Sequence, residues 1–195
     1  MKKLYYLIPL LCLACAPPPS NEPFANAFKV LDGKWQGIFH IYEDSRGQQA
    51  NETQPKEISL EHLKSLPLTE TMTLEVEQHY QSTSPYYQTV KIIDTYTKED
   101  GTKEVVKSSG VNKVEKGKLW CIVDKPDEQI VHSGEWDGKN TIIWQRNIKK
   151  PLKIEYFKET VEADTYSIIG WGYYGDDDPK KSPKMWFYAA YKRVE

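Results

Sequence analysis

The stretch that decides the fold reads Lys-Trp-Gln-Gly-Ile-Phe-His-Ile-Tyr-Glu-Asp, residues 34–44. Successive side chains of a β-strand point to opposite faces, so every second residue of this stretch shares a face. One of the two faces carries Trp35, Gly37, Phe39 and Ile41. The alternation predicts a strand with one face turned to a core.

The residues on either side of this strand predict short covering elements. Before it, Phe24, Phe28 and Leu31 are spaced as on one face of a short helix, which Gly33 ends. After it, residues 45–68 are polar up to Pro55 and then contain four spaced apolar residues. This second segment predicts a short helix or an irregular cover that stops at Pro67.

From Thr69 onward the sequence predicts one strand after another. The turns between them fall at sequences such as Glu99-Asp100-Gly101, where glycine tolerates the positive φ of a tight turn. The predicted strands are 71–80, 86–98, 102–109, 111–115, 118–124, 128–136, 140–149, 152–162, 165–174 and 184–194. Short turns without a long helical crossover predict an all-β, antiparallel up-and-down sheet of roughly ten strands. Because such a sheet exposes its edges unless it closes, we expect a β-barrel spanning 24–195 as a single domain.

The first residues have the pattern of an export signal. Lys2 and Lys3 precede an apolar run from Leu4 to Leu13, which is too short to cross a membrane as a helix. The run ends in Leu-Cys-Leu-Ala-Cys, residues 11–15, which resembles a bacterial lipobox with Ala14 directly before the cysteine. The resemblance implies that 1–14 is a lipoprotein signal peptide and that Cys15 carries the lipid. Cleavage by the ordinary signal peptidase is the alternative.

The Pro-rich residues 15–23 then predict a tether. Consecutive prolines favour the extended polyproline II conformation and do not join a core. Such a chain would link a membrane through its N-terminal lipid to the barrel. We therefore expect a lipid-anchored monomer in a bacterial cell envelope, on the periplasmic face of the outer membrane.

The cysteines and the net charge restrict the classes of function that the sequence supports. Once Cys12 is discarded and Cys15 is acylated, Cys121 alone remains, in an apolar strand where we expect a buried small hydrophobe. The formal net charge is −2, and it becomes −4 when the two leader lysines are removed. Nucleic-acid binding usually requires a basic face, so no nucleic-acid partner is expected.

The two ends of the barrel region resemble the lipocalin-like (calycin) barrels. The segment Leu-Asp-Gly-Lys-Trp-Gln-Gly, residues 31–37, is similar to the helix followed by Gly-x-Trp that begins the first strand of those barrels. The resemblance implies that Trp35 plugs the closed end and that a basic residue of the last strand lies over it. Arg193 is the expected residue and Lys192 the substitute, since a cation over an indole ring gains cation–π energy. The strand count exceeds the eight of a standard lipocalin, which suggests a larger barrel or an extra hairpin.

Aromatic residues are the main candidates for ligand contact. Facing inward near an open mouth, they would line a pocket suited to an amphiphilic molecule, whereas near the base they would be core. The candidates are Trp120, Trp144, Trp171, Trp186 and Tyr173.

The sequence contains few patterns that are typical of catalytic, metal or cofactor sites. No pair among the four histidines has metal-ligand spacing, and no nucleophile elbow or phosphate-binding loop occurs, so no catalytic residue, metal or cofactor is assigned. A haem pocket needs only one histidine, such as His40, and therefore stays open. Glu75, Glu77 and His79 share a strand face that could act as an acid–base row, although the opposite face is more apolar and should be the inner one. The run Asp-Asp-Asp, residues 176–178, is interpreted as a solvated loop rather than a calcium site.

The leading hypothesis is therefore a lipid-anchored barrel that binds a small hydrophobic or amphiphilic molecule in its cavity. Two other classes stay open. A filled barrel would favour an interaction module in which an outer face or residues 45–68 bind a protein or the cell wall. A cavity with converging carboxylate and histidine would favour an enzyme.

Overall fold

The structure is a computed structural model that describes residues 19–50 and 53–194. The predicted signal peptide and Cys15 lie outside these residues. Within them the strands are β1 (Gly33–Asp44), β2 (Leu68–Ser84), β3 (Tyr87–Thr97), β4 (Lys103–Glu115), β5 (Lys118–Asp124), β6 (Gln129–Trp136), β7 (Thr141–Lys149), β8 (Leu152–Glu162), β9 (Thr165–Tyr174) and β10 (Met185–Val194). No helix in the described part of the chain is long and apolar enough to cross a membrane.

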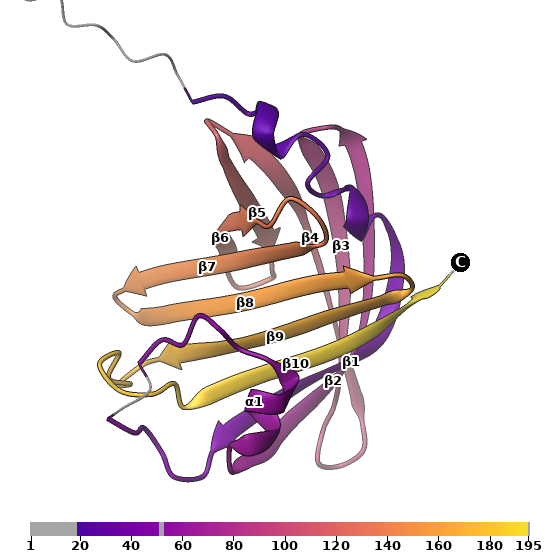
Figure 1. The fold of residues 1–195 in the computed structure, drawn as a ribbon. Helices are drawn as coiled ribbons and strands as arrows, with labels where there is room; N and C mark the ends of the chain where they lie inside the picture. Colours follow the sequence, from indigo (N-terminus) through magenta and orange to yellow (C-terminus); the bar gives the residue numbers. More distant parts are fainter. Residues whose placement is uncertain (1–18, 51–52, 195) are drawn as a thin grey trace, which may run out of the picture.

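The ten strands form a closed antiparallel barrel (Figure 1). Each strand pairs with the next one in sequence, and β1 pairs with β10 in a register that sets Trp35 opposite Arg193. The all-β, up-and-down barrel expected from the sequence is confirmed. One predicted break between strands is absent, because β4 continues through Gly110 where two separate strands, 102–109 and 111–115, were predicted.

One end of the barrel is closed by the residues that precede β1. They form two 3-10 turns, η1 (Glu22–Phe24) and η2 (Lys29–Leu31), in place of the continuous short helix expected from the spacing. Phe28 and Leu31 are fully buried, and the Phe28 ring stacks against Trp144 at 6.3 Å between ring centroids. The Gln88 side chain donates to the Phe28 carbonyl oxygen at 2.8 Å and so fixes the turn over the barrel end. We call this the plugged end.

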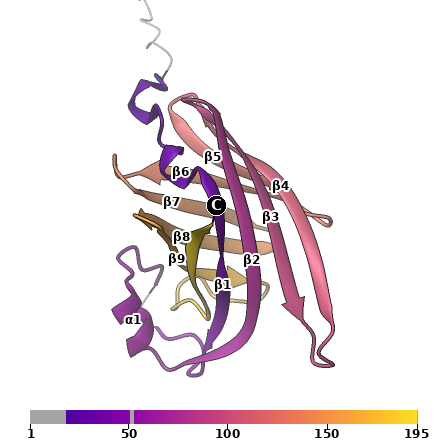
Figure 2. The same ribbon diagram turned by 90° about the vertical axis from the view of Figure 1, so that its right-hand side faces the viewer.

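The outer wall of β8, β9 and β10 is covered by the connection between β1 and β2. This connection contains α1 (Leu60–Ser65), whose N-cap Ser59 accepts a hydrogen bond from the His62 amide at 3.1 Å. Figure 2 shows α1 on one side of the barrel and the β3–β4 hairpin on the other. Beneath the cover lies a second apolar core, made of Ile58, Leu63, Ile154, Tyr156, Trp171, Tyr173 and Trp186.

Candidate functional site

The inner face of the barrel, here called the lumen, follows from the strand register. Cross-strand partners share a face, so the side chains that align with Trp35 around the barrel all point inward. The same rule places Cys121 opposite Asn112 on the inner face, and Glu159 opposite Ile168. The lumen therefore contains titratable and polar groups among its apolar residues.

The lumen is not completely packed. Phe39, Cys121, Phe157 and Glu159 are each only partly buried, although all four point to the inside of a closed barrel. Their remaining accessible surface must face the interior, because the barrel wall covers their other sides. These four side chains therefore keep part of their surface accessible inside the barrel.

Glu159 is the carboxylate nearest the plugged end of the lumen. Trp144 donates its indole N–H to Glu159 Oε2 at 2.9 Å. Burial raises the pKa of Glu159 to about 7, because a charged carboxylate loses solvation there, and the bonds from Trp144 and Tyr166 offset only part of this. Glu159 therefore changes charge near neutral pH.

Three tyrosines from other strands lie around this carboxylate. Tyr166 packs against Tyr191 and Tyr80 at centroid distances of 5.3 and 6.2 Å. Burial raises the pKa of all three phenols well above their usual range, and the negative charge of Glu159 raises it further. The tyrosines consequently stay neutral while Glu159 titrates.

A second polar cluster lies farther toward the open end. Glu155 Oε2 is 2.9 Å from His132 Nε2 and 3.6 Å from Arg146 Nη1, and the Tyr174 hydroxyl donates to Glu155 Oε1 at 2.9 Å. Burial alone would raise the pKa of Glu155, but the His132 hydrogen bond and the nearby positive charges leave it lowered. In contrast to Glu159, this carboxylate is surrounded by cationic and donor groups.

An apolar aromatic patch lies beside these clusters. Phe187 packs against Phe157 at 5.3 Å and against Phe39 at 5.9 Å between ring centroids. The Phe157 ring lies over Gly170, where an added Cβ would come within 2.6 Å of the ring. The glycine thus makes room for the ring, and the lumen combines aromatic and polar surfaces.

A cleft between β2 and the β3–β4 hairpin opens onto the lumen. The pairing of β2 with β3 ends at Leu74 and Tyr96, while the first residues of β2 stay paired with β1. The space left between them has a volume of about 1090 Å³, and its lining includes Met72, Tyr96 and Val106, which lie on inner-face positions. The barrel wall is therefore split at the end opposite the plug.

The structure places the predicted closing pair together. The guanidinium carbon of Arg193 lies 4.1 Å from the centroid of the Trp35 ring, which is itself fully buried. The Trp35 indole N–H donates to the Leu31 carbonyl oxygen at 2.7 Å. The substitute residue Lys192 points outward and donates to Thr165 Oγ1 at 2.8 Å.

The predicted ligand-contacting aromatics divide between the two faces. Trp144 lies inside, close to the plug. Trp171 and Tyr173 occupy outer-face positions, because the alternate residues Gly170 and Gly172 of β9 face inward. Trp186 and Trp120 also lie on the outer face. These four residues therefore do not face the lumen.

The outer aromatics have a structural explanation. The Trp171 indole N–H donates to the Pro55 carbonyl oxygen at 2.7 Å, and the Tyr173 hydroxyl accepts from the Gln54 amide at 3.2 Å. The Trp186 ring lies 5.5 Å from His62 of α1. These side chains hold the cover on the barrel wall.

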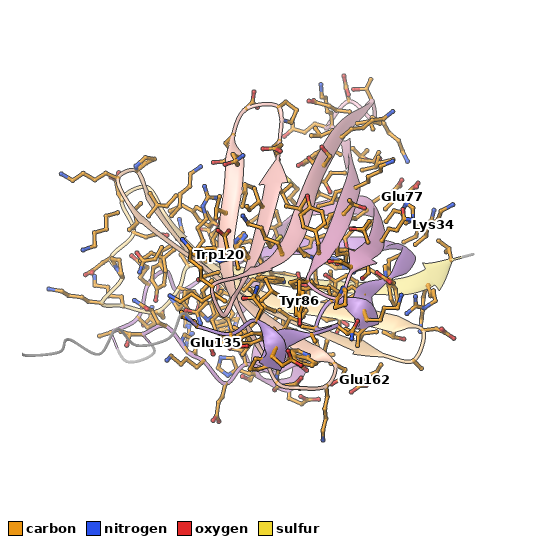
Figure 3. All side chains as sticks on the ribbon, turned by 90° about the horizontal axis from the view of Figure 1, so that it is seen from above. Lys34, Glu77, Tyr86, Trp120, Glu135 and Glu162 are labelled. Atoms are coloured by element: carbon orange, nitrogen blue, oxygen red, sulfur yellow. The ribbon has the colours of Figure 1, made fainter. Side chains whose placement is uncertain are left out.

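The other candidate residues lie outside the lumen. Glu75 and Glu77 are exposed on the outer face; Lys103 donates to Glu75 at 2.9 Å, and Glu77 lies close to Lys34 (Figure 3). His40 pairs with Glu70 on the outer face. The loop at 176–178 is organised by its own turns, with Asp177 accepting from the Tyr174 amide. Among the residues that the structure describes, no group of three or more His, Cys, Asp or Glu side chains is placed to hold a metal.

Sequence reasoning missed Glu155, Glu159, Arg146 and His132 as lumen residues. In β8 the alternation sets apolar Ile154 and Tyr156 against charged neighbours, which by the usual rule would turn the apolar pair inward. The pair instead faces outward, where the cover buries it. A strand buried on both faces gives no reliable signal of which face is the inner one.

Comparisons with known proteins give the following result. No protein-family model matches the chain, and no curated protein matches it. Among solved structures, a redesigned β-barrel is similar at 15% identity with a TM-score of 0.38, covering 88% of this chain and 97% of that one. The redesigned β-barrel mFAP0 bound to DFHBI is similar at 14% identity with a TM-score of 0.36, covering 84% and 99%. At this identity and TM-score the likeness carries no information on the function of this chain.

Proposed function

We propose that this protein is a lipid-anchored, lipocalin-like envelope protein whose lumen binds a small hydrophobic or amphiphilic molecule. The observation that carries the proposal is a set of buried polar atoms in the lumen. Within the described residues, Ser108 Oγ, Asn112 Oδ1, Tyr191 Oη and Arg146 Nε have no hydrogen-bond partner. All four belong to inner-face side chains.

Unpartnered polar atoms in a lumen indicate that something else satisfies them. Each such atom costs about 1–3 kcal/mol when nothing replaces the lost water. Water or the polar groups of a ligand would remove that cost. Because the aromatic patch of Phe39, Phe157 and Phe187 lies in the same lumen, an amphiphilic molecule fits better than a purely polar one.

The cleft beside β2 gives the ligand a route. It opens on the inner face at Met72 and Val106. The plugged end is closed by Phe28 and Leu31, so entry from that side would require the N-terminal turns to leave. Entry through the cleft requires no such change.

A pair of adjacent serines tests lumen binding. Ser108 is buried on the inner face, whereas Ser109 is exposed on the outer face of the same strand. Ser108→Phe should fill the lumen and weaken binding of the neutral amphiphilic dye prodan at least tenfold, while Ser109→Phe should leave it unchanged. Dye fluorescence gives the affinity, and circular dichroism confirms that both variants fold. Absence of dye binding to the natural chain, or equal binding by both variants, would contradict the proposal.

The position of the tether supports the anchored part of the proposal. The Gly117 amide donates to Asn21 Oδ1 at 2.8 Å, and Asn21 Nδ2 donates to Val114 O at 3.4 Å, so the tether is held on the β4–β5 turn at the plugged end. Pro19 lies four residue steps after Cys15, and four steps span at most about 14 Å. A lipid on Cys15 would thus hold the plugged end near a membrane and leave the cleft facing away.

Anchoring is tested by expressing the full chain in a bacterium. The protein should partition with membranes and carry the mass of a lipidated chain that begins at Cys15, whereas Cys15→Ser should abolish the added mass. A soluble product cleaved elsewhere would show that the ordinary signal peptidase acts and that the anchor is absent.

A further inference from the structure

Glu159 differs from the other carboxylates of the lumen in having no cationic partner. Glu155 is paired with His132 and Arg146, and Glu128 at the rim is paired with Arg146 and Lys153. Asp94, on the inner face of β3, lies 3.6 Å from Lys125. Within residues 19–50 and 53–194, no lysine, arginine or histidine forms an ion pair with Glu159, and its hydrogen bonds come from the neutral side chains of Trp144 and Tyr166. An ionised carboxylate in such surroundings lacks a compensating charge.

The groups that face Glu159 from the neighbouring strands are aromatic or neutral. They are Tyr80 on β2, Cys121 on β5, Trp144 on β7, Tyr166 on β9 and Tyr191 on β10. Burial raises the pKa of the Cys121 thiol, as it does for the tyrosines, so these groups stay uncharged. Aromatic faces and edges around one carboxylate form the kind of surroundings that stabilise an organic cation.

Residual accessible surface and an unused hydrogen-bonding group lie on neighbouring inner-face side chains. Glu159 and Cys121 keep accessible surface toward the lumen. Tyr191 is 1% exposed, and its hydroxyl has no partner in the described part of the chain. A ligand head group placed here would meet the carboxylate, the hydroxyl and the aromatic rings together.

We propose that the lumen selects amphiphiles with an ammonium head group, which pairs with Glu159 among Tyr80, Trp144, Tyr166 and Tyr191 while the apolar part lies on the aromatic patch of Phe39, Phe157 and Phe187. This inference rests on the proposed lumen binding and names the ligand class. An anionic head group would instead meet the carboxylate without a compensating cation. The affinity of a neutral amphiphile would not depend on the charge of Glu159.

The inference predicts a distinct dependence of binding on pH. The carboxylate of Glu159 is mostly protonated at pH 5 and mostly ionised at pH 8, since its pKa is about 7. A permanently charged ammonium therefore gains its partner as pH rises. Its affinity should increase at least tenfold between these values, because each pK unit corresponds to a tenfold change.

The test compares three ten-carbon amphiphiles below their critical micelle concentrations: decyltrimethylammonium, decan-1-ol and decyl sulfate. Each competes with prodan at pH 5 and pH 8. Decyltrimethylammonium should bind at least tenfold more tightly at pH 8 and more tightly than decyl sulfate, and decan-1-ol should show no such pH effect. Glu159→Gln should remove the pH effect while decan-1-ol still binds. Glu162→Gln is the matched control, since Glu162 is exposed on the same strand.

The outcomes separate the two proposals. If prodan and decan-1-ol fail to bind, lumen binding itself is wrong. The ammonium inference is overturned if prodan and decan-1-ol bind but decyl sulfate binds as tightly as decyltrimethylammonium. It is also overturned if Glu159→Gln keeps the pH effect. In both cases lumen binding stands.

Discussion

Glu159 shows at the scale of one residue how the lumen links stability to pH. Its pKa in the folded protein is about 7, against a value of 4.5 for an unperturbed glutamate. Between these two values the folded chain binds more protons than the unfolded chain. This stability contribution is complete below pH 4.5 and is lost as pH rises to about 7, and its size is on the order of 3 kcal/mol.

Glu159→Gln should therefore flatten the acid-to-neutral part of the stability profile. Relative to the natural chain, the variant should gain stability progressively from pH 4.5 to 7 and keep that gain above pH 7. Urea unfolding across this pH range measures the difference, with Glu162→Gln as the control. A constant offset between variant and natural chain over the whole range would show that Glu159 does not titrate in this window.

At the scale of elements, the connection that carries α1 supplies Ile58 and Leu63 to a second core. Leu63 is 5% exposed and packs with the outward-facing aromatics of β9 and β10. The stacked rings of Tyr156 and Trp171, 5.4 Å apart, lie in the same cluster. Without this cover the outer wall would expose a large apolar patch, which soluble proteins generally avoid.

Leu63→Ala should lower the free energy of unfolding by about 2–4 kcal/mol, because it removes a buried side chain and leaves a cavity. Lys64→Ala, at the exposed neighbouring position, should change it by less than about 0.5 kcal/mol. Thermal or urea unfolding compares the two. Equal small effects would mean that α1 contributes little to holding the cover in place.

At the scale of the whole molecule, closure joins the first and last strands of the chain. Lys34 pairs with Val194, so the barrel closes only when residues 160 positions apart meet. Arg193 strengthens this junction, since it lies over Trp35, donates to the Asp32 carbonyl oxygen and is 3.6 Å from Asp164. The Arg193 side chain, on the last strand, therefore contacts residues at the start of the first strand.

Arg193→Ala should destabilise the barrel by about 1–2 kcal/mol through the lost cation–π and hydrogen-bond contacts. Lys192→Ala removes an equal charge from the outer face and should have little effect. Chemical denaturation measures both variants under the same conditions. A larger loss of stability for Lys192→Ala than for Arg193→Ala would show that Arg193 is not the residue that stabilises closure.

The sequence by itself determined the strands and their antiparallel order. Period-two alternation and glycine-marked turns are local features, and they reappear in β1 to β10 with small changes of boundary. The resemblance to lipocalin-like barrels added the expectation that a basic residue of the last strand, Arg193 or Lys192, lies over Trp35.

Only the tertiary structure decided which face of β8 and β9 is the lumen. The cover buries Ile154, Trp171 and Trp186 from outside, so hydrophobicity no longer marks the inner face, and Gly170 and Glu159 face inward instead. The physical reason is that burial depends on what packs against a strand from a distant part of the chain. Alternation in a strand fixes which residues share a face, and packing alone fixes where that face points.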